Sequence, residues 1–266
     1  MPYVELKDFK LHYIDIPAKR DNSGNFPIVM LHGFTLDHRM WLDDAAYFSQ
    51  WYRVILPDFK GHGLSDAPES GYSRAHRVED MIGLLGSLAI DKAHVVGLSM
   101  GGTTALGMAL KYPGRLASMT LVSTSAAGFD PGPKIRKIDE IARSQGLESA
   151  KEKWIKSSLR YFGSDKSHIR DLLETMMTEH SGAVWADPMR RKYPRESDLE
   201  RVHGIRLPTL ILAGELDRPF VPLARELHKR IPGSRLSIYD NTGHMLNLET
   251  FNKFRGDLKV FLEGIY

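Results

Sequence analysis

The sequence predicts an α/β protein in which a parallel sheet carries helices on both faces. Short, fully apolar runs bounded by turn residues recur along the chain, and such runs are typical of strands buried on both sides. Segments with apolar residues at helical spacing separate these runs, which predicts right-handed crossovers between parallel strands. One long segment, from Gly128 to about Gly204, has no strand-like run and interrupts the alternation.

The expected strands follow from the apolar runs, which end near turn residues such as Gly33 or Pro57. They cover Lys10–Ile16, Ile28–Leu31, Tyr52–Leu56, His94–Gly97, Met119–Val122, Thr209–Ala213 and Arg235–Tyr239. The helices expected between and after them cover Arg74–Leu88, Gly101–Leu110, Pro222–Ile231 and Leu248–Leu262. Apolar residues recur in the first of these helices with the period of an amphipathic helix.

The strand-free segment opens with Asp130-Pro131-Gly132-Pro133 and continues with three helical patterns. We interpret residues 128–204 as a helical cap inserted into a core made of residues 1–127 and 205–266. The helical patterns cover Ile135–Gln145, Glu148–Tyr161 and Ser167–Glu179. Most of the large apolar residues of the cap are expected to pack it onto the sheet, and a few to line a pocket: Trp154, Tyr161, Phe162, Met176, Met177, Trp185 and Met189.

The composition excludes several classes of site and partner. Among 266 residues there are 36 Lys and Arg, 33 Asp and Glu, 11 His and no Cys. The lack of cysteine rules out disulfides, thiolate catalysis, zinc–cysteine sites and iron–sulfur clusters, and a net charge of +3 is too dilute for a nucleic-acid partner. No window approaches 18 uninterrupted apolar residues, and charges near the N-terminus argue against a signal peptide. We therefore expect a cytoplasmic protein without nucleic-acid or membrane partners.

The segment Gly97-Leu98-Ser99-Met100-Gly101 matches the pattern G-x-S-x-G. Its context makes it informative, because a strand run precedes it and a helix of small apolar residues follows. That strand–turn–helix arrangement presents a serine hydroxyl at the start of a helix, where the helix dipole favours developing negative charge. Ser99 is therefore the candidate nucleophile, and the alternative is a glycine-rich turn with an idle serine.

A serine nucleophile needs a base to take its proton and a third group to orient that base. The chain order Ser, acid, His predicts an acid after a late strand and a histidine after the last one. Asp217 follows the next-to-last expected strand and His244 follows the last, so both fall where ligands bind in open α/β sheets. Glu215 and Asp240 are the competing acids, and most of the other ten histidines are expected at the surface or in turns.

The segment Leu31-His32-Gly33-Phe34 supplies the third element, directly after an apolar strand. In this geometry the backbone amides of Phe34 and Met100 point at the oxyanion of a tetrahedral intermediate. Because the donors are backbone groups, the side chains at these positions influence the shape of the site rather than its charge.

Together these motifs resemble those of the α/β-hydrolase superfamily, and the resemblance covers nearly the whole chain. The run Asp58-Phe59-Lys60-Gly61-His62-Gly63-Leu64-Ser65 is similar to the family's D-x-x-G-H-G-x-S turn, in which Asp58 is expected to hold a loop rather than react. A second match runs from Gly243-His244-Met245 to Leu248-Glu249. The resemblance implies an eight-stranded, mostly parallel sheet flanked by helices, with a helical cap between the sixth and seventh core strands.

Within the superfamily, the chain resembles compact bacterial esterases, enol-lactonases and carbon–carbon hydrolases. A serine at position 99 separates it from haloalkane dehalogenases and epoxide hydrolases, which use aspartate there. We predict a carboxylic ester hydrolase that forms an acyl-enzyme on Ser99, needs no metal or organic cofactor, and exists as a monomer or homodimer. Its substrates are expected to be small to medium esters, in a pocket that includes Leu98, Val221, Trp154 and Trp185.

Two alternatives stay open. A carbon–carbon hydrolase or enol-lactonase of aromatic catabolism would act on substrates with carboxylates and would need a cation in the pocket. The candidates for that cation, which are otherwise expected on the solvated surface, are Arg39, Lys60, Arg190 and Arg191. The second alternative is a hydrolase-fold receptor for a small ligand, since such receptors keep the triad; multiple turnover of esters distinguishes an enzyme from a receptor.

Overall fold

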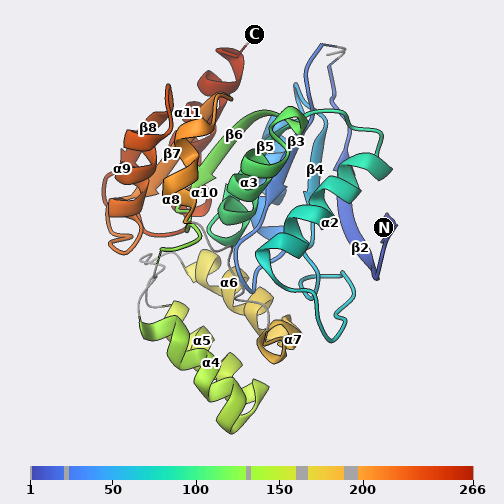
Figure 1. The fold of residues 1–266 in the computed structure, drawn as a ribbon, viewed down its shortest axis with the longest axis vertical. Coiled ribbons are helices and arrows are strands. Elements are labelled where there is room, and N and C mark those ends of the chain that lie inside the picture. Colours follow the sequence, from blue (N-terminus) through green and yellow to red (C-terminus); the bar gives the residue numbers. More distant parts are fainter. Residues whose placement is uncertain (1, 21–23, 130–132, 160–166, 189–196, 266) are drawn as a thin grey trace.

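The structure is a computed structural model that describes residues 2–20, 24–129, 133–159, 167–188 and 197–265. Its central sheet has eight strands in the order β1-β2-β4-β3-β5-β6-β7-β8 (Figure 1). Neighbours from β4 to β8 pair in parallel, whereas β1 with β2 and β2 with β4 pair antiparallel. The predicted eight-stranded, mostly parallel sheet is therefore confirmed. The strands are β1 Tyr3–Leu6, β2 Phe9–Ile16, β3 Ile28–Leu31, β4 Val54–Pro57, β5 Ala93–Leu98, β6 Leu116–Val122, β7 Thr209–Gly214 and β8 Arg235–Tyr239.

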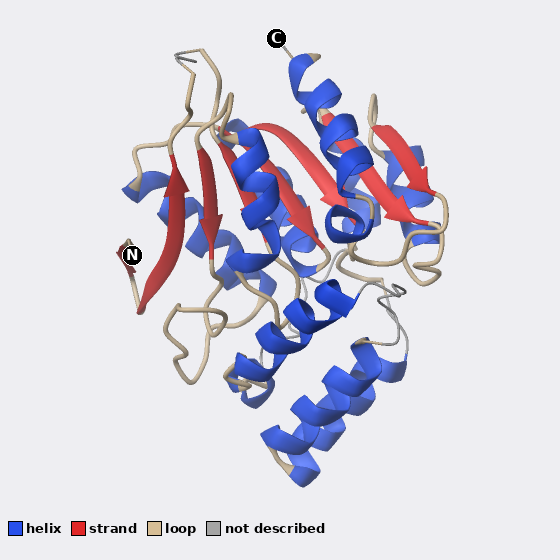
Figure 2. Cartoon of the chain, turned by 180° about the vertical axis from the view of Figure 1, so that it is seen from behind, coloured by secondary structure: helices blue, strands red, loops and turns tan. Residues whose placement is uncertain are grey.

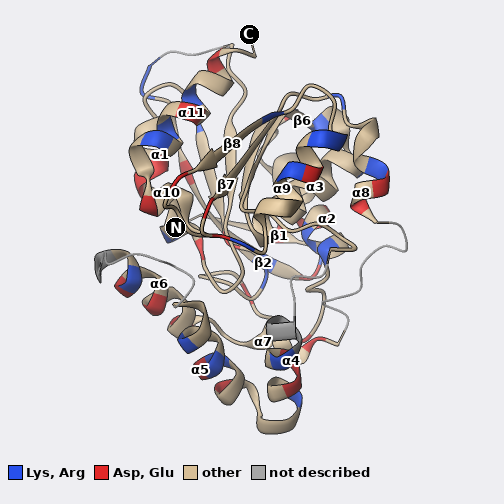
Figure 3. Cartoon of the chain, turned by 90° about the vertical axis from the view of Figure 1, so that its left-hand side faces the viewer, with Lys and Arg blue, Asp and Glu red and all other residues tan. Residues whose placement is uncertain are grey.

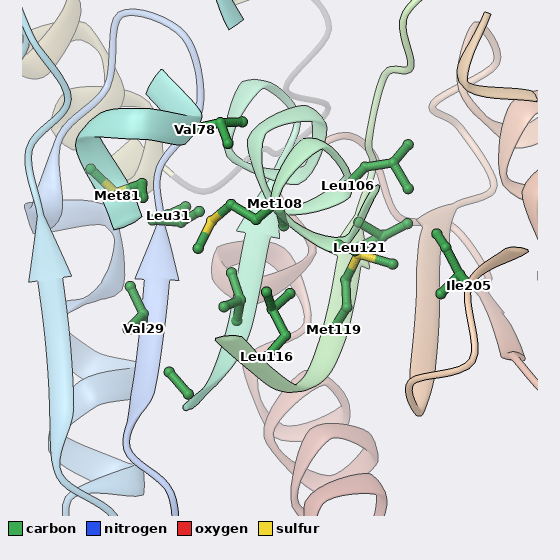
Figure 4. Close-up of a cluster of buried hydrophobic side chains, with 14 of the residues drawn as sticks. Val29, Leu31, Val78, Met81, Leu106, Met108, Leu116, Met119, Leu121 and Ile205 are labelled. Carbon is green, nitrogen blue, oxygen red and sulfur yellow. The ribbon is translucent and has the colours of Figure 1, made fainter. Parts of the chain in front are cut away.

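The helices of the core form a layer on each face of the sheet. Successive residues of a strand point to opposite faces, so in β3 Val29 and Leu31 pack into one apolar cluster, and Ile28 and Met30 into another. The first cluster includes residues of α2 and α3 (Figure 4) and of α9, and the second includes residues of α1 and α11. These helices are α1 Leu42–Phe48, α2 Arg74–Ser87, α3 Met100–Lys111, α9 Val221–Arg230 and α11 Phe251–Glu263.

Two features of the core differ from the sequence-based expectation. Strand β1 was not among the expected runs because it lies at the edge of the sheet and its residues alternate between exposed and half-buried. The single helix expected over Leu248–Leu262 is wrong: the structure has two helices there, α10 (Leu246–Glu249) and α11. The break falls at Thr250, whose backbone is non-helical at φ −134° and ψ 48°.

The segment between β6 and β7 is helical, as expected, and holds α4 Pro133–Gln145, α5 Leu147–Ser158, α6 Ser167–Glu179, α7 Ala183–Ala186 and α8 Asp198–Arg201. Helices α4 to α7 lie beyond the carboxyl ends of the parallel strands (Figure 2). In contrast, α8 contacts α9 of the core, and its Asp198 accepts hydrogen bonds from the Arg74 side chain at 2.8 Å and from the Ala127 amide at 2.6 Å. The boundaries of a separate cap, residues 128–204, stay a prediction.

Charges are mixed along the surface of the described chain. Basic and acidic positions occur side by side on helices of both the core and the inserted segment (Figure 3). Within the described residues, no helix combines the length and the apolar character that crossing a membrane requires.

Candidate active site

Ser99 lies between β5 and α3, at the tip of a sharp turn. Its backbone has φ 54° and ψ −107°, a left-handed conformation that residues other than glycine rarely adopt. The turn is held on both sides: the Ser99 amide donates to the Val122 carbonyl at 2.9 Å, and the Ser99 carbonyl accepts from the Thr103 amide at 3.0 Å. Strain of this kind is characteristic of functional positions.

The glycines of the motif are required by close backbone contacts. A Cβ atom on Gly101 would lie 2.2 Å from the Leu31 carbonyl oxygen, and one on Gly97 would lie 2.4 Å from the Gly101 carbonyl oxygen. These partners are backbone atoms that cannot rotate away. The spacing of the motif therefore reflects how tightly β5, the turn and α3 pack against β3.

Asp217 and His244 meet at the carboxyl ends of β7 and β8. The Nδ1 atom of His244 lies 2.8 Å from Oδ2 of Asp217, and the Asp217 side chain is only 3% exposed. The competing acids are placed differently. Glu215 is exposed and accepts a hydrogen bond from the Asn241 amide at 3.0 Å, and Asp240 is exposed beside β8. Of the three candidate acids, the structure thus brings Asp217 to the histidine.

Glu249 fixes the loop that carries His244. Its Oε2 atom accepts from the Gly243 amide at 2.8 Å and its Oε1 atom from the Met245 amide at 2.9 Å. The two amides flank His244 in the chain, so one buried carboxylate holds the backbone on both sides of the imidazole. The sequence placed Glu249 in a family-like run, but no spacing rule showed that its two oxygens brace this loop.

Replacing Glu249 by Gln is expected to lower both stability and turnover. A glutamine has one carbonyl oxygen, so one of the two amides would face an NH₂ group in a buried place. An unsatisfied buried donor costs about 1–3 kcal/mol, which should appear as a lower free energy of unfolding in urea. Glu215→Gln is the matched control, because Glu215 also accepts a backbone amide but is exposed. Equal stability of the two variants would contradict this role of Glu249.

Phe220 contacts the other side of the histidine and was not among the expected site residues. Its ring centroid lies 5.1 Å from that of His244 and 6.2 Å from that of Phe129. It precedes the predicted pocket residue Val221, which is half-buried at the start of α9. A phenylalanine ring has no hydrogen-bonding group, so sequence spacing offered no signal for this contact.

The two proposed oxyanion donors lie on adjacent elements. Met100 is the first residue of α3, and Phe34 lies in the turn that follows β3. His32 supports this turn: its Nε2 atom accepts from the Phe59 amide at 3.0 Å, so the proton resides on Nδ1, which lies 2.8 Å from the Gly33 carbonyl. Burial lowers the pKa of His32, which keeps the ring in this neutral form.

The predicted pocket residues fall into two groups. Trp154 of α5 and Trp185 of α7 both pack edge-on against the Phe34 ring, at centroid distances of 5.3 and 5.5 Å. Leu98 is fully buried in the sheet, with its Cδ2 atom close to Gly33. The structure thus brings the two tryptophans to the Phe34 turn, whereas Leu98 packs in the core beneath it. Tyr161, Phe162 and Met189 lie outside the described residues.

The expectation that most other histidines lie at the surface or in turns is wrong for His12 and His94, which lie in β2 and β5, whereas His62 lies in a turn as expected. Five of these histidines are nevertheless buried. His12, His32, His62, His94 and His180 are at most 3% exposed. The rings of His62 and His180 meet edge-on beside Phe34, with their centroids 4.5 Å apart. Burial lowers the pKa of His180 to about 3 and holds the pKa of His62 well below its ordinary value. Buried neutral imidazoles therefore surround the Phe34 turn.

Asp58 has the loop-holding role expected of it. Its carboxylate lies 2.8 Å from Nδ1 of His12 and 2.9 Å from Nδ1 of His38, and it accepts from the amides of His38 and Leu64. The ligand atoms of these three side chains are close enough to surround a metal ion. However, hydrogen bonds already engage both carboxylate oxygens, so the cluster joins β2, the end of β4 and the short 3-10 helix His38–Trp41.

The cations considered for carboxylate recognition are already paired where the structure describes them. Arg39 binds Asp37 and Glu179 at 2.6 and 2.5 Å. Lys60 is 3% exposed at its side chain, not solvated as expected, and lies 3.8 Å from Asp80 and 4.4 Å from the Phe9 ring centroid. Arg190 and Arg191 lie outside the described residues. A cavity of about 240 Å³ opens beside Arg39, between Leu64 and the His180 end of α6.

Comparison with known proteins agrees with this architecture. Residues 28–253 match the Alpha/beta hydrolase family. A putative 2-succinyl-6-hydroxy-2,4-cyclohexadiene-1-carboxylate synthase of Bacillus subtilis is 29% identical over 93% of this chain and 94% of its own. A 2-hydroxy-6-oxo-6-phenylhexa-2,4-dienoate hydrolase of Burkholderia cepacia is 30% identical over 94% of this chain and 90% of its own.

A solved structure gives the same picture at the level of the fold. The crystal structure of the enol-lactonase from Burkholderia xenovorans LB400 superposes with a TM-score of 0.84 at 25% identity, covering 98% of this chain and all of that one. The similar proteins thus carry different reactions on one architecture. The family match extends from β3 into α11 and includes every residue of the predicted triad. The chain therefore belongs to the α/β-hydrolase family.

Proposed function

We propose that the chain is a serine hydrolase that cleaves small to medium carboxylic esters. The observation that carries this proposal is the strained backbone of Ser99 at the start of α3, together with the 2.8 Å contact between His244 and Asp217 at neighbouring strand ends. A sharp strand-to-helix turn exposes a nucleophile, and a buried carboxylate on Nδ1 leaves Nε2 of the histidine to act as the base.

In the proposed reaction, the Ser99 hydroxyl attacks the ester carbonyl while His244 takes its proton. Asp217 holds the imidazole in the required tautomer and stabilises the imidazolium. The amides of Phe34 and Met100 stabilise the oxyanion of the tetrahedral intermediate. His244 then protonates the departing alcohol, and a water molecule activated by the same histidine releases the acid from Ser99.

Ester cleavage fits the charges near the site better than cleavage of a carboxylate-bearing carbon–carbon substrate. Arg39 would have to leave Asp37 or Glu179 to bind a substrate carboxylate, and Lys60 is buried against Asp80. The aromatic side chains around Phe34 favour an apolar group instead. The similarity to an enol-lactonase supports the same bond type, since a lactone is a cyclic ester.

The test compares Ser99→Ala with Ser123→Ala on p-nitrophenyl esters of increasing acyl length. Ser123 is a matched control, because it follows the neighbouring strand β6 and has a positive φ of 43°. We expect multiple turnovers by the wild type and by Ser123→Ala, with the highest kcat/KM for short and medium chains. Ser99→Ala is expected to lose about 10⁴-fold or more in kcat.

Other outcomes would point to the alternatives. A single slow turnover with the product retained on the protein would favour a ligand receptor. Weak ester turnover combined with fast, Ser99-dependent cleavage of a vinylogous 1,5-diketone acid would favour the carbon–carbon hydrolase.

A further inference from the structure

The turn that carries Phe34 has an unusual residue at its third position. The Leu36 amide donates to the Gly33 carbonyl at 3.3 Å, which closes a four-residue turn. Thr35 lies at the third position with φ 60° and is 1% exposed. Glycine is preferred at a third turn position with positive φ, and a β-branched residue is an outlier there. Surrounding contacts must therefore hold Thr35 in this conformation.

Trp154 supplies such a contact from the inserted helical segment. Its indole Nε1–H donates to the Thr35 hydroxyl at 2.7 Å, across 119 positions of sequence. The same hydroxyl donates its own proton to the Phe34 carbonyl at 2.6 Å. The two bonds form a directed chain from Trp154 through Thr35 to the Phe34 backbone, in which the Thr35 hydroxyl accepts the first bond and donates the second.

The Phe34 side chain is held by the same segment. The rings of Trp154 and Trp185 meet it nearly perpendicularly, at interplanar angles of 80° and 86°. The carbonyl and the ring of Phe34 are thus both fixed by contacts that involve α5 and α7. These contacts hold the Phe34 side chain and the peptide that follows it. The Phe34 N–H lies in the preceding peptide plane, whose Gly33 carbonyl accepts from the Leu36 amide and lies 2.8 Å from Nδ1 of His32. With both flanking peptides held, the direction of the Phe34 N–H is set.

We propose that Trp154 is a positioning residue that aims the Phe34 amide at the oxyanion. This inference rests on the proposed ester hydrolysis by Ser99. The oxyanion develops only in the transition state, so a misdirected donor lowers kcat without weakening substrate binding. If Trp154 only lined the substrate pocket, its loss would instead raise KM and leave kcat unchanged.

The kinetic test is a double-mutant cycle on p-nitrophenyl acetate. Trp154→Phe keeps an aromatic ring but removes the N–H, and Thr35→Val keeps the β-branched shape but removes the hydroxyl. We expect each variant to lose about tenfold or more in kcat, as when an oxyanion donor is weakened, with KM within about twofold. The double variant should be no slower than the slower single variant, because both changes break one chain of bonds.

Two further variants separate positioning from general damage. Thr35→Ser restores the hydroxyl and should recover most of the lost kcat. Trp51→Phe, at a tryptophan that packs beside Tyr47 and away from the Phe34 turn, should leave kcat and KM unchanged. A raised KM with unchanged kcat in Trp154→Phe, or additive losses in the double variant, would overturn the inference.

A spectroscopic readout does not depend on turnover. In ¹H–¹⁵N spectra of the free protein, Trp154→Phe and Thr35→Val should each displace the backbone amide resonances of Phe34 and Thr35, whereas Trp51→Phe should not. Unchanged resonances in Trp154→Phe would overturn the inference even in an active enzyme. If wild type and Ser99→Ala turned over esters equally, the proposed function would fail, and the catalytic role of Trp154 would fail with it.

Discussion

Asp217→Asn is expected to lower kcat for ester hydrolysis by about 10⁴-fold while the fold stays intact. An asparagine can offer its NH₂ group to Nδ1 of His244, which places the imidazole proton on Nε2. The nitrogen that should take the Ser99 proton would then already carry one. The side chains have nearly the same size, so thermal unfolding should change little compared with the loss of activity.

The competing acids provide the controls for this experiment. Glu215→Gln and Asp240→Asn should keep near-normal kcat, because both residues are exposed and Glu215 binds a backbone amide instead of the histidine. If Asp217→Asn kept near-normal activity and either control lost it, the assignment of the acid would be wrong. Burst kinetics with p-nitrophenyl acetate would show whether acylation is the step that slows.

His94→Asn is expected to flatten the dependence of stability on pH between pH 7 and pH 5. Burial in β5 lowers the pKa of His94 to about 4, whereas the unfolded residue titrates near 6.5. As the pH falls below 6.5, the imidazole of His94 binds a proton in the unfolded chain but not in the folded one, so the folded state loses stability. At pH 5 this amounts to about 2 kcal/mol for one histidine.

The difference between wild type and variant isolates this effect from groups that act in the opposite direction. Burial raises the pKa of Asp44 and of Asp80 to about 6, so these residues stabilise the folded state as the pH falls. The asparagine keeps a polar atom near the position of Nδ1, which lies 2.8 Å from the Ser118 hydroxyl. Urea unfolding at pH 7 and pH 5 should show wild type losing about 2 kcal/mol relative to His94→Asn.

An exposed histidine controls for the loss of an imidazole as such. His203→Asn, in the turn before β7, should leave the difference between pH 7 and pH 5 as in wild type. If the free energy of unfolding changed equally with pH in wild type and His94→Asn, His94 would bind its proton as readily in the folded as in the unfolded chain, which would contradict the prediction.

Much of the fold could be predicted because its central strands are continuous apolar runs. The bounds of β3 and β8 coincide with expectation, since each run is terminated by turn residues on both sides. The alternating edge strand β1 lacks such a run. No proline or glycine marks the break at Thr250, the residue between α10 and α11. Local patterns therefore predict buried strands better than they predict edges and helix breaks.

The candidate site shows the same division. Ser99, Asp217 and His244 each follow a recognisable strand, so their positions along the chain predict that they meet. The supporting contacts depend on tertiary structure alone: Glu249 bonds amides on both sides of His244, and Trp154 reaches Thr35 across 119 residues. No spacing rule connects such residues. The burial of five further histidines was not predicted either, because the residues that cover them come from distant elements.

The role proposed for Ser99 is that of the nucleophile. An organophosphate ester that reacts with activated serines tests it directly, because the adduct is covalent and can be located by peptide mapping. We predict one adduct per chain, on the peptide that contains Ser99, with simultaneous loss of esterase activity and no labelling of Ser99→Ala. An adduct on any other serine, or full activity in the labelled protein, would contradict this role of Ser99.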